Sequence, residues 1–246
     1  MNYFVTGGSR GLGAAIVHQA VREGHDVAFT FKNHEADAHA VIAQAMQINN
    51  ARKVRAYRMD VGSSADVEEV GNRVLDDFES VEVVVANAGV NVNNLVANMS
   101  DDEWDTVIRT NLTGAFYTAR QFLSAMVGNR FGRIIFMSSL GAGGVSGQAN
   151  YSASKAGLLG LSSAIAKEYG RKGITSNCIV AGFFDTDMTR EGMSAANRSF
   201  WLQYCPQGRI GDASEAAKAV TFLASDAASF INGQALPING GLDWAP

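Results

Sequence analysis

The fold follows from the segment Asn2-Tyr-Phe-Val-Thr-Gly-Gly-Ser-Arg-Gly-Leu-Gly13. Its apolar part predicts a short strand over Asn2–Thr6, and an amphipathic pattern predicts a helix from about Leu12 to Glu23. The glycines between them leave the backbone bare, so a pyrophosphate could approach N–H groups at the positive end of the helix. The spacing is G-x-x-x-G-x-G, and three glycines can also form an ordinary turn. A strand before and a helix after are nevertheless the context that a dinucleotide site requires.

Strand and helix patterns then alternate along the whole chain, with no linker, repeat or low-complexity tract. This alternation predicts one α/β domain over residues 1–246, a Rossmann-type, doubly wound parallel sheet with helices on both faces. Ligands of such sheets bind outside the carboxyl ends of the strands. Further strands are expected at Asp26–Phe31, Val54–Met59, Val81–Ala86, Gly132–Ser138, Ile174–Val180 and Gln234–Ile238, and further helices at Ser64–Phe78, Asp101–Val127, Tyr151–Gly170 and Ala213–Ser225.

Composition limits the possible functions. The chain has 246 residues, of which 47% are hydrophobic and 18% are charged, so a large core is expected and a disordered chain is not. The net charge of −4 gives no support to nucleic-acid binding. Cys178 and Cys205 lack the spacing of a metal or redox site, and no metal site is expected. Because no signal peptide and no apolar run of about 18 residues are visible, we expect a cytoplasmic protein without a membrane segment.

Charge near the second strand indicates a cofactor preference. Sites selective for NAD place an acid at this strand end to hold the ribose 2′-hydroxyl, whereas a 2′-phosphate requires cations. The segment Thr30-Phe-Lys-Asn33 has no acid before Glu35. Lys32, together with Arg10 of the glycine turn, therefore predicts NADP(H), although both could be ordinary surface charges.

Polar residues follow several predicted strands, and we expect them to lie near the ligand. Asp60-Val61 follows the third strand and Asn87-Ala-Gly89 the fourth, where small side chains leave room for an adenosine. Asn111 interrupts a long helical pattern. Ser138 and Ser139 end the fifth strand.

The segment Tyr151-Ser-Ala-Ser-Lys155 is the candidate for acid-base chemistry. Residues four apart share one face of a helix, where an ammonium near a phenol favours the phenolate. A tyrosine with a pKa near 10 would need a shift of roughly three units to work near neutrality. A Tyr and a Lys at this spacing also occur on solvated helix faces, so the surrounding motifs decide.

Residues 183–211 form an irregular segment after the sixth strand, in which aromatic residues and methionines alternate with Gly, Asn and Arg. A segment of this kind over the ligand edge predicts a substrate lid. A helical pair packed on the core is an equal alternative.

Taken together, the motifs resemble the short-chain dehydrogenase/reductases over the whole chain. The resemblance rests on Thr6-Gly-x-x-x-Gly11-x-Gly13, Asn87-Ala-Gly89, Asn111, Ser139, Tyr151-x-x-x-Lys155 and Thr186. Within that family the chain is most similar to bacterial 3-oxoacyl-[acyl-carrier-protein] reductases. The segments that carry this closer similarity are 147–157, 172–175, 185–189, 231–234 and 239–241.

The resemblance implies a mechanism. NADPH would lie along the strand ends with its nicotinamide beside Tyr151, which protonates the alkoxide formed by hydride transfer. Lys155 would hold the nicotinamide ribose and lower the tyrosine pKa, Ser139 would hydrogen-bond the carbonyl, and Asn111 would support a water relay. The expected cofactor-binding residues are Gly7, Ser9, Arg10, Gly11, Leu12, Gly13, Lys32, Asp60, Val61, Asn87, Ala88, Gly89, Tyr151, Lys155, Phe184 and Thr186.

The chain departs from the family pattern in two places. Ala181-Gly182 stands where the family usually has Pro-Gly. The loop before Tyr151 is also one residue short, so that counting back from Tyr151 indicates Ser138 while aligning the strand indicates Ser139. We favour Ser139, because slipping a strand by one residue turns over every side chain, whereas a loop absorbs a deletion easily.

The resemblance also implies a substrate and partners. A β-ketoacyl thioester on acyl carrier protein would be reduced, with Arg130 and Lys172 beside the active-site mouth receiving the acidic carrier. The aromatic residues of segment 183–211 could fit an extended, unsaturated or aromatic chain, so the pathway could be polyketide or polyene synthesis as well as fatty-acid synthesis. The alternative is a free small-molecule ketone or alcohol, such as a sugar, steroid or polyketide intermediate. A homotetramer is expected, and apolar residues on several sides of the long helices and over Leu236–Trp244 agree with it.

Overall fold

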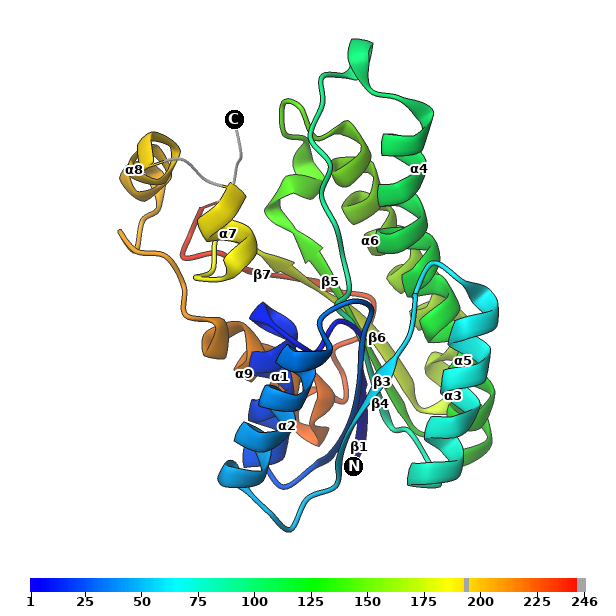
Figure 1. Ribbon diagram of the computed structural model, residues 1–246. Coiled ribbons are helices and arrows are strands. Elements are labelled where there is room, and N and C mark those ends of the chain that lie inside the picture. The colour runs from blue at the N-terminus through cyan, green and yellow to red at the C-terminus, as the bar shows by residue number, and fades with distance from the viewer. Residues whose placement is uncertain (193–194, 243–246) are drawn as a thin grey trace.

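The computed structural model describes residues 1–192 and 195–242, and Figure 1 gives the arrangement of the elements. Seven parallel strands form one sheet in the order β3-β2-β1-β4-β5-β6-β7. The order reverses between β1 and β4, which makes the sheet doubly wound. The strands are β1 (Asn2–Val5), β2 (Asp26–Phe31), β3 (Val54–Arg58), β4 (Val83–Ala86), β5 (Gly132–Ser139), β6 (Ile174–Ala181) and β7 (Ala235–Ile238).

Helices cover both faces of this sheet, as the sequence predicted (Figure 1). One face carries α1 (Gly11–Arg22), α2 (Glu35–Ile48) and α9 (Ala213–Ala224), and the other carries α3 (Ser64–Phe78), α5 (Gly114–Asn129) and α6 (Ala149–Tyr169). The shorter helix α4 (Asp101–Ile108) packs against α6.

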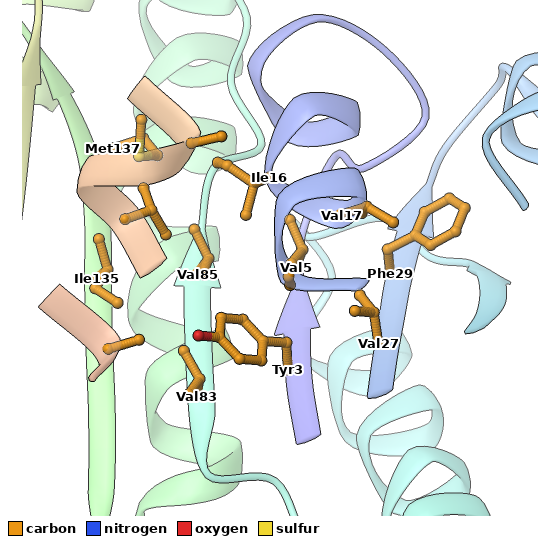
Figure 2. Close-up of a cluster of buried hydrophobic side chains, with 14 of the residues drawn as sticks. Tyr3, Val5, Ile16, Val17, Val27, Phe29, Val83, Val85, Ile135 and Met137 are labelled. Atoms are coloured by element: carbon orange, nitrogen blue, oxygen red, sulfur yellow. The ribbon is translucent and has the colours of Figure 1, made fainter. Parts of the chain in front are cut away.

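Each face has its own apolar core, because the central strands are buried on both sides. In the first core, Ile16 and Val17 of α1 lie over Tyr3 and Val5 of β1 (Figure 2). The second core is centred on Phe4, also of β1, whose ring lies 4.7 Å from that of Phe122 of α5, measured between centroids. The side chains of β1 therefore alternate between two cores, and the strand is fixed at the centre of the sheet.

Two helical predictions need correction. Helix α2 was not predicted, although Ala38, Val41 and Ala45 recur at helical spacing and are buried. The predicted helix Asp101–Val127 is divided into α4 and α5 by a π-helical turn, η2 (Arg109–Thr113). This turn lies at Asn111, where the sequence indicated an interruption. A π turn changes the direction of neighbouring side chains and is frequent at functional sites.

The segment 183–211 contains two short helices, α7 (Asp187–Gly192) and α8 (Ala195–Tyr204). Residues 193–194 of the proposed lid lie outside the described residues, as do the last residues of the apolar stretch Leu236–Trp244. Among the helices of residues 1–192 and 195–242, none is long and apolar enough to cross a bilayer.

Candidate active site

The glycine turn after β1 forms a cradle with no room for side chains. Gly7 and Gly11 have φ angles of +66° and +56°, which favour glycine. A Cβ on Gly13 would lie 2.1 Å from the carbonyl oxygen of Gly7. Arg10 precedes α1 without capping it by a side-chain hydrogen bond, so the first N–H groups of the helix have no side-chain acceptor from this residue. This bare, electropositive cradle fits the pyrophosphate of a dinucleotide.

The end of β4 is fastened to this cradle. The Thr6 hydroxyl accepts hydrogen bonds from the backbone N–H groups of Asn87 and Ala88, both at 3.0 Å. In return the Asn87 amide donates to the carbonyl oxygens of Thr6 at 3.0 Å and Gly7 at 3.1 Å. Asn87 and Ala88 therefore lie beside the glycine turn, as expected for one binding site.

Asn111 and Lys155 meet at Gly89. The buried Asn111 amide accepts from the N–H of Val90 at 2.8 Å and donates to the Val90 carbonyl at 2.9 Å. The Lys155 Nζ, also buried, donates to the carbonyl of Met137 at 2.7 Å. A Cβ on Gly89 would lie 3.3 Å from Asn111 Oδ1 and 3.4 Å from Lys155 Nζ. Gly89, which has no side chain, thus makes room for the side chains of Asn111 and Lys155.

Ser139, rather than Ser138, faces Tyr151. The buried Ser138 hydroxyl donates to the backbone carbonyl of Lys155 at 2.9 Å. The half-buried Ser139 hydroxyl accepts from the N–H of Gly141 at 3.1 Å. A Cβ on Gly141 would lie 3.5 Å from Ser139 Oγ and 3.2 Å from Cε1 of Tyr151, so both side chains border the same small space.

Burial determines the ionisation of this group. It raises the pKa of the Tyr151 phenol, and a hydrogen bond with the Ser139 side chain only partly opposes the rise. Burial also lowers the pKa of Lys155 from 10.5 to about 8. The Lys155 Nζ lies 5.6 Å from the Tyr151 ring centroid. The expected downward shift of the tyrosine pKa is therefore not found, because desolvation of the phenolate outweighs the hydrogen bond with Ser139.

The two predicted phosphate cations differ in their surroundings. Lys32 Nζ lies 2.6 Å from Oδ2 of Asp60, at the ends of β2 and β3. Arg10 is exposed, and within residues 1–192 and 195–242 it takes part in no ion pair.

The other predicted cofactor residues lie at or close to the carboxyl edge of the sheet, where the glycine turn also lies. Ser9 and Val61 are buried and Leu12 is half-buried. The methyl carbon of Thr186 would be 3.7 Å from a Cβ on Gly11, so Thr186 lies next to the glycine turn. The Phe184 side chain instead belongs to the first core and packs against Gly211.

Arg130 and Lys172 are not beside this site. Both precede strands, and Ser139 ends one. The eight residues of β5, at about 3.3 Å each, separate the two edges of the sheet by roughly 25 Å. Within one chain, the cationic pair expected beside the active-site mouth therefore lies at the opposite edge of the sheet, because all strands of a parallel sheet begin at one edge and end at the other.

Two further polar residues of this site were not predicted. The Ser154 hydroxyl accepts from the Asn111 amide at 3.2 Å and donates to the Tyr151 carbonyl at 2.7 Å. The fully buried Asn150 amide donates to the carbonyls of Val92 and Glu103, both at 3.0 Å. Asn150 directly precedes Tyr151-x-x-x-Lys155 and Ser154 lies within it, and this position in the sequence was the available signal.

A cavity of about 320 Å³ lies under the segment 183–211. Its lining includes Phe183, Trp201 and Leu202 of this segment, together with Ile238 and Leu242 from the end of the chain. The rings of Phe183 and Trp201 are 4.8 Å apart between centroids, which holds the start of this segment against α8.

Comparison with known proteins identifies the family. A short-chain dehydrogenase model described as "Enoyl-(Acyl carrier protein) reductase" matches residues 7–243. The chain belongs to the short-chain dehydrogenase/reductase family. It is 40% identical to the 3-oxoacyl-[acyl-carrier-protein] reductase FabG of Salmonella typhimurium, over 97% of this chain and 95% of the relative. The FabG of Pseudomonas aeruginosa is 41% identical, with the same coverage of both chains.

A solved structure agrees with the fold. Levodione reductase superposes with a TM-score of 0.95 at 30% sequence identity, covering 98% of this chain and 97% of that chain. The predicted family and its closer similarity to 3-oxoacyl-[acyl-carrier-protein] reductases are thereby confirmed. The chain is an oxidoreductase of this family.

Proposed function

We propose that the protein reduces the ketone of a β-ketoacyl thioester, with NADPH as the cofactor. One observation carries this proposal: the phenol of Tyr151 and the hydroxyl of Ser139 border the same small space, with Lys155 Nζ 5.6 Å from the centroid of the Tyr151 ring. Two hydroxyl donors that meet at one point suit a carbonyl oxygen, which accepts both hydrogen bonds and takes up a proton when it is reduced.

Four side chains would take part in the reduction. The hydroxyls of Ser139 and Tyr151 would both donate to the carbonyl oxygen and stabilise the negative charge that develops there. Tyr151 then gives its proton to the alkoxide. Lys155, still mostly protonated at pH 7, adds positive charge beside the phenol, and Asn111 supports the return of the proton. NADPH, when bound, supplies the hydride.

The cofactor assignment rests on the glycine cradle and on charge. The cradle fits a pyrophosphate, and Arg10 is an exposed cation beside it. The N–H of Gly8 donates to the carbonyl of Thr30 at 2.9 Å, so the cradle and the end of β2 lie next to each other. A 2′-phosphate between them would meet cations, which favours NADPH.

Acyl carrier protein is the proposed donor of the substrate, as the names of the FabG relatives indicate for those proteins. Arg130 and Lys172 follow the C-terminal ends of α5 and α6, at the far edge of the sheet. In a dimer with a two-fold axis perpendicular to α5 and α6, the C-terminal ends of these helices in one subunit would lie beside the N-terminal ends of the same helices in its partner. The basic pair could then serve the active site of the neighbouring subunit.

The direct test mixes the protein with NADPH and either acetoacetyl or crotonyl thioester, while absorbance at 340 nm is followed. We expect turnover of the ketone and none of the enoyl compound. Turnover of crotonyl thioester alone would instead support the activity for which the family model is named.

The carrier is tested with Arg130→Glu/Lys172→Glu. Complementary surface charge mainly accelerates encounter, and salt screens it. The variant should lose activity steeply on carrier-bound substrate and retain it on the N-acetylcysteamine analogue. Mixing it with Tyr151→Phe subunits should restore carrier-dependent activity if the pair acts on the neighbouring subunit. Equal losses on both substrates would reject the carrier.

The alternative substrate is a free small-molecule ketone or alcohol. The similarity to levodione reductase favours it, because the name of that protein describes a reductase without a carrier. We further propose that the cavity under segment 183–211 accommodates an extended or aromatic acyl chain, as in polyketide or polyene synthesis as well as fatty-acid synthesis. The cavity residue Ile238 lies two strands away from Ser139, which is roughly 10 Å at about 4.8 Å per strand spacing.

A further inference from the structure

Lys32 and Asp60 form an ion pair across the ends of two neighbouring strands. Lys32 directly follows β2, Asp60 follows β3 after one residue, and the register pairs Phe31 with Arg58. The Lys32 Nζ lies 2.6 Å from Oδ2 of Asp60. The cation that the sequence assigned to the 2′-phosphate thus already has an anionic partner.

Asp60 is the fixed member of the pair. Its second oxygen, Oδ1, accepts a hydrogen bond from the N–H of Gly62 at 2.9 Å. Partial burial alone would raise the pKa of Asp60, but the hydrogen bonds from Lys32 and Gly62 hold it below its usual range. The Lys32 side chain is 62% exposed, against 35% for Asp60. The carboxylate therefore stays charged and in place, while the lysine is free to move.

Arg10, unlike Lys32, has no carboxylate partner among the residues that the structure describes. It is also exposed. Its place before α1 puts it two residues after Gly8, whose N–H is bonded to the Thr30 carbonyl at the end of β2. A dianion at this strand end would meet Arg10 without competition, but would compete with Asp60 for Lys32.

We infer that Asp60 is a cofactor-specificity residue, which holds Lys32 back from a 2′-phosphate and so limits a preference for NADPH that Arg10 provides. This inference rests on the proposed NADPH-dependent function. It follows from charge: the Lys32–Asp60 pair is neutral as a unit, and an unpaired carboxylate there would repel a phosphate. Removing the carboxylate should sharpen the preference, whereas removing the ammonium should weaken it.

The test compares kcat/KM for NADPH with that for NADH in four variants. Contacts to the adenine are common to both cofactors, so their loss cancels in the ratio. Asp60→Asn should raise the NADPH preference about fivefold, Lys32→Ala should lower it about fivefold, and Arg10→Ala should lower it at least tenfold, as expected for charge-assisted hydrogen bonds at a partly exposed site. Asp60→Asn/Lys32→Ala should return the ratio close to that of the wild type.

Arg55→Ala is the matched control. Arg55 lies on β3 and pairs with Asp77, so this change removes a cation and breaks an ion pair of the same strand away from its carboxyl end. The ratio should not change. Calorimetric titration with NADP⁺ and NAD⁺ repeats the comparison without turnover and separates this inference from the proposed reaction.

Two results would overturn the inference. In the first result, Asp60→Asn leaves the ratio of kcat/KM for NADPH to that for NADH unchanged, and the double variant has a ratio as low as that of Lys32→Ala. Asp60 would then not restrain the lysine. If the double variant keeps the full gain of Asp60→Asn, the effect does not pass through Lys32. A wild type that binds both cofactors but reduces no ketone would reject the proposed function and leave the binding comparison valid.

Discussion

At the scale of single residues, two adjacent serines at the end of β5 have different surroundings. The Ser138 hydroxyl donates a hydrogen bond to the backbone carbonyl of Lys155 in α6, whereas the Ser139 side chain borders Tyr151. Because neighbouring side chains of a strand point to opposite faces, only one of them can reach the substrate.

Ser139→Ala should lower kcat about a hundredfold or more, the usual loss when one donor to a developing oxyanion is removed. Ser138→Ala is its control. It should retain most of the activity and lose about 1 kcal/mol of stability with its buried hydrogen bond. Steady-state rates and urea unfolding measure both effects. A larger loss of kcat in Ser138→Ala would reverse the assignment.

The lowered pKa of Lys155, about 8, predicts a pH limit for reduction. The ammonium is present below this value and is lost as the pH rises through it, while the phenol of Tyr151 stays protonated because its own pKa is raised. With saturating substrates, kcat should therefore decline above about pH 8. Lys155→Met should be slow at every pH and lack this decline. A wild-type profile that is flat up to pH 10 would contradict the role of the ammonium.

At the scale of elements, the close contact between the glycine turn and α1 tolerates no side chain. Gly13→Ala would put a Cβ against the backbone oxygen of Gly7, which is 2.1 Å away and cannot move like the end of a side chain. We expect at least tenfold weaker NADP⁺ binding, together with a loss of about 1–3 kcal/mol of stability from overpacking.

Gly128→Ala is the control for Gly13→Ala, because a Cβ there meets nothing within 4 Å. In the exposed last part of α5 it should stabilise the protein by about 0.5–1 kcal/mol and leave NADP⁺ binding unchanged. Titration calorimetry and thermal melts of both variants make the comparison. Normal cofactor affinity in Gly13→Ala would show that the turn does not bind the pyrophosphate.

At the scale of the whole molecule, apolar side chains are exposed over helices on opposite faces of the sheet. Trp104 of α4 and Phe116 of α5 are each 40% exposed, and Phe222 of α9 and the nearby Phe230 are 45% and fully exposed. The resemblance implies a homotetramer, and a closed tetramer would result if each of these two faces paired with its own copy about a two-fold axis.

Light scattering should therefore give a mass of about 104 kDa, four times the chain mass of 26.1 kDa. Phe116→Glu should reduce the assembly to dimers by breaking one interface, and Phe116→Glu/Phe230→Glu should give monomers. Ala153→Glu, an exposed substitution near Tyr151 on α6, tests whether that helix face is covered as well. A wild type that is monomeric at micromolar concentration would refute the tetramer.

The sequence alone was sufficient for the order of the strands, for the family, and for most of the polar residues at the carboxyl edge. These depend on local pattern: apolar alternation, a glycine turn and motifs of fixed spacing. Helix α2 was missed even though its buried residues recur at helical spacing, because its many alanines give little contrast between an apolar and a polar face.

Only the tertiary structure decided which serine faces Tyr151, which direction the tyrosine pKa takes, and which cation is already paired. Each of these depends on contacts between distant parts of the chain: Ser138 with the backbone of α6, Tyr151 with the groups that bury it, and Lys32 with Asp60. Burial and partner distance set desolvation and charge, and neither can be read from the order of residues. The position of Arg130 and Lys172 could have been foreseen, because residues that precede parallel strands lie at the edge opposite to those that follow them.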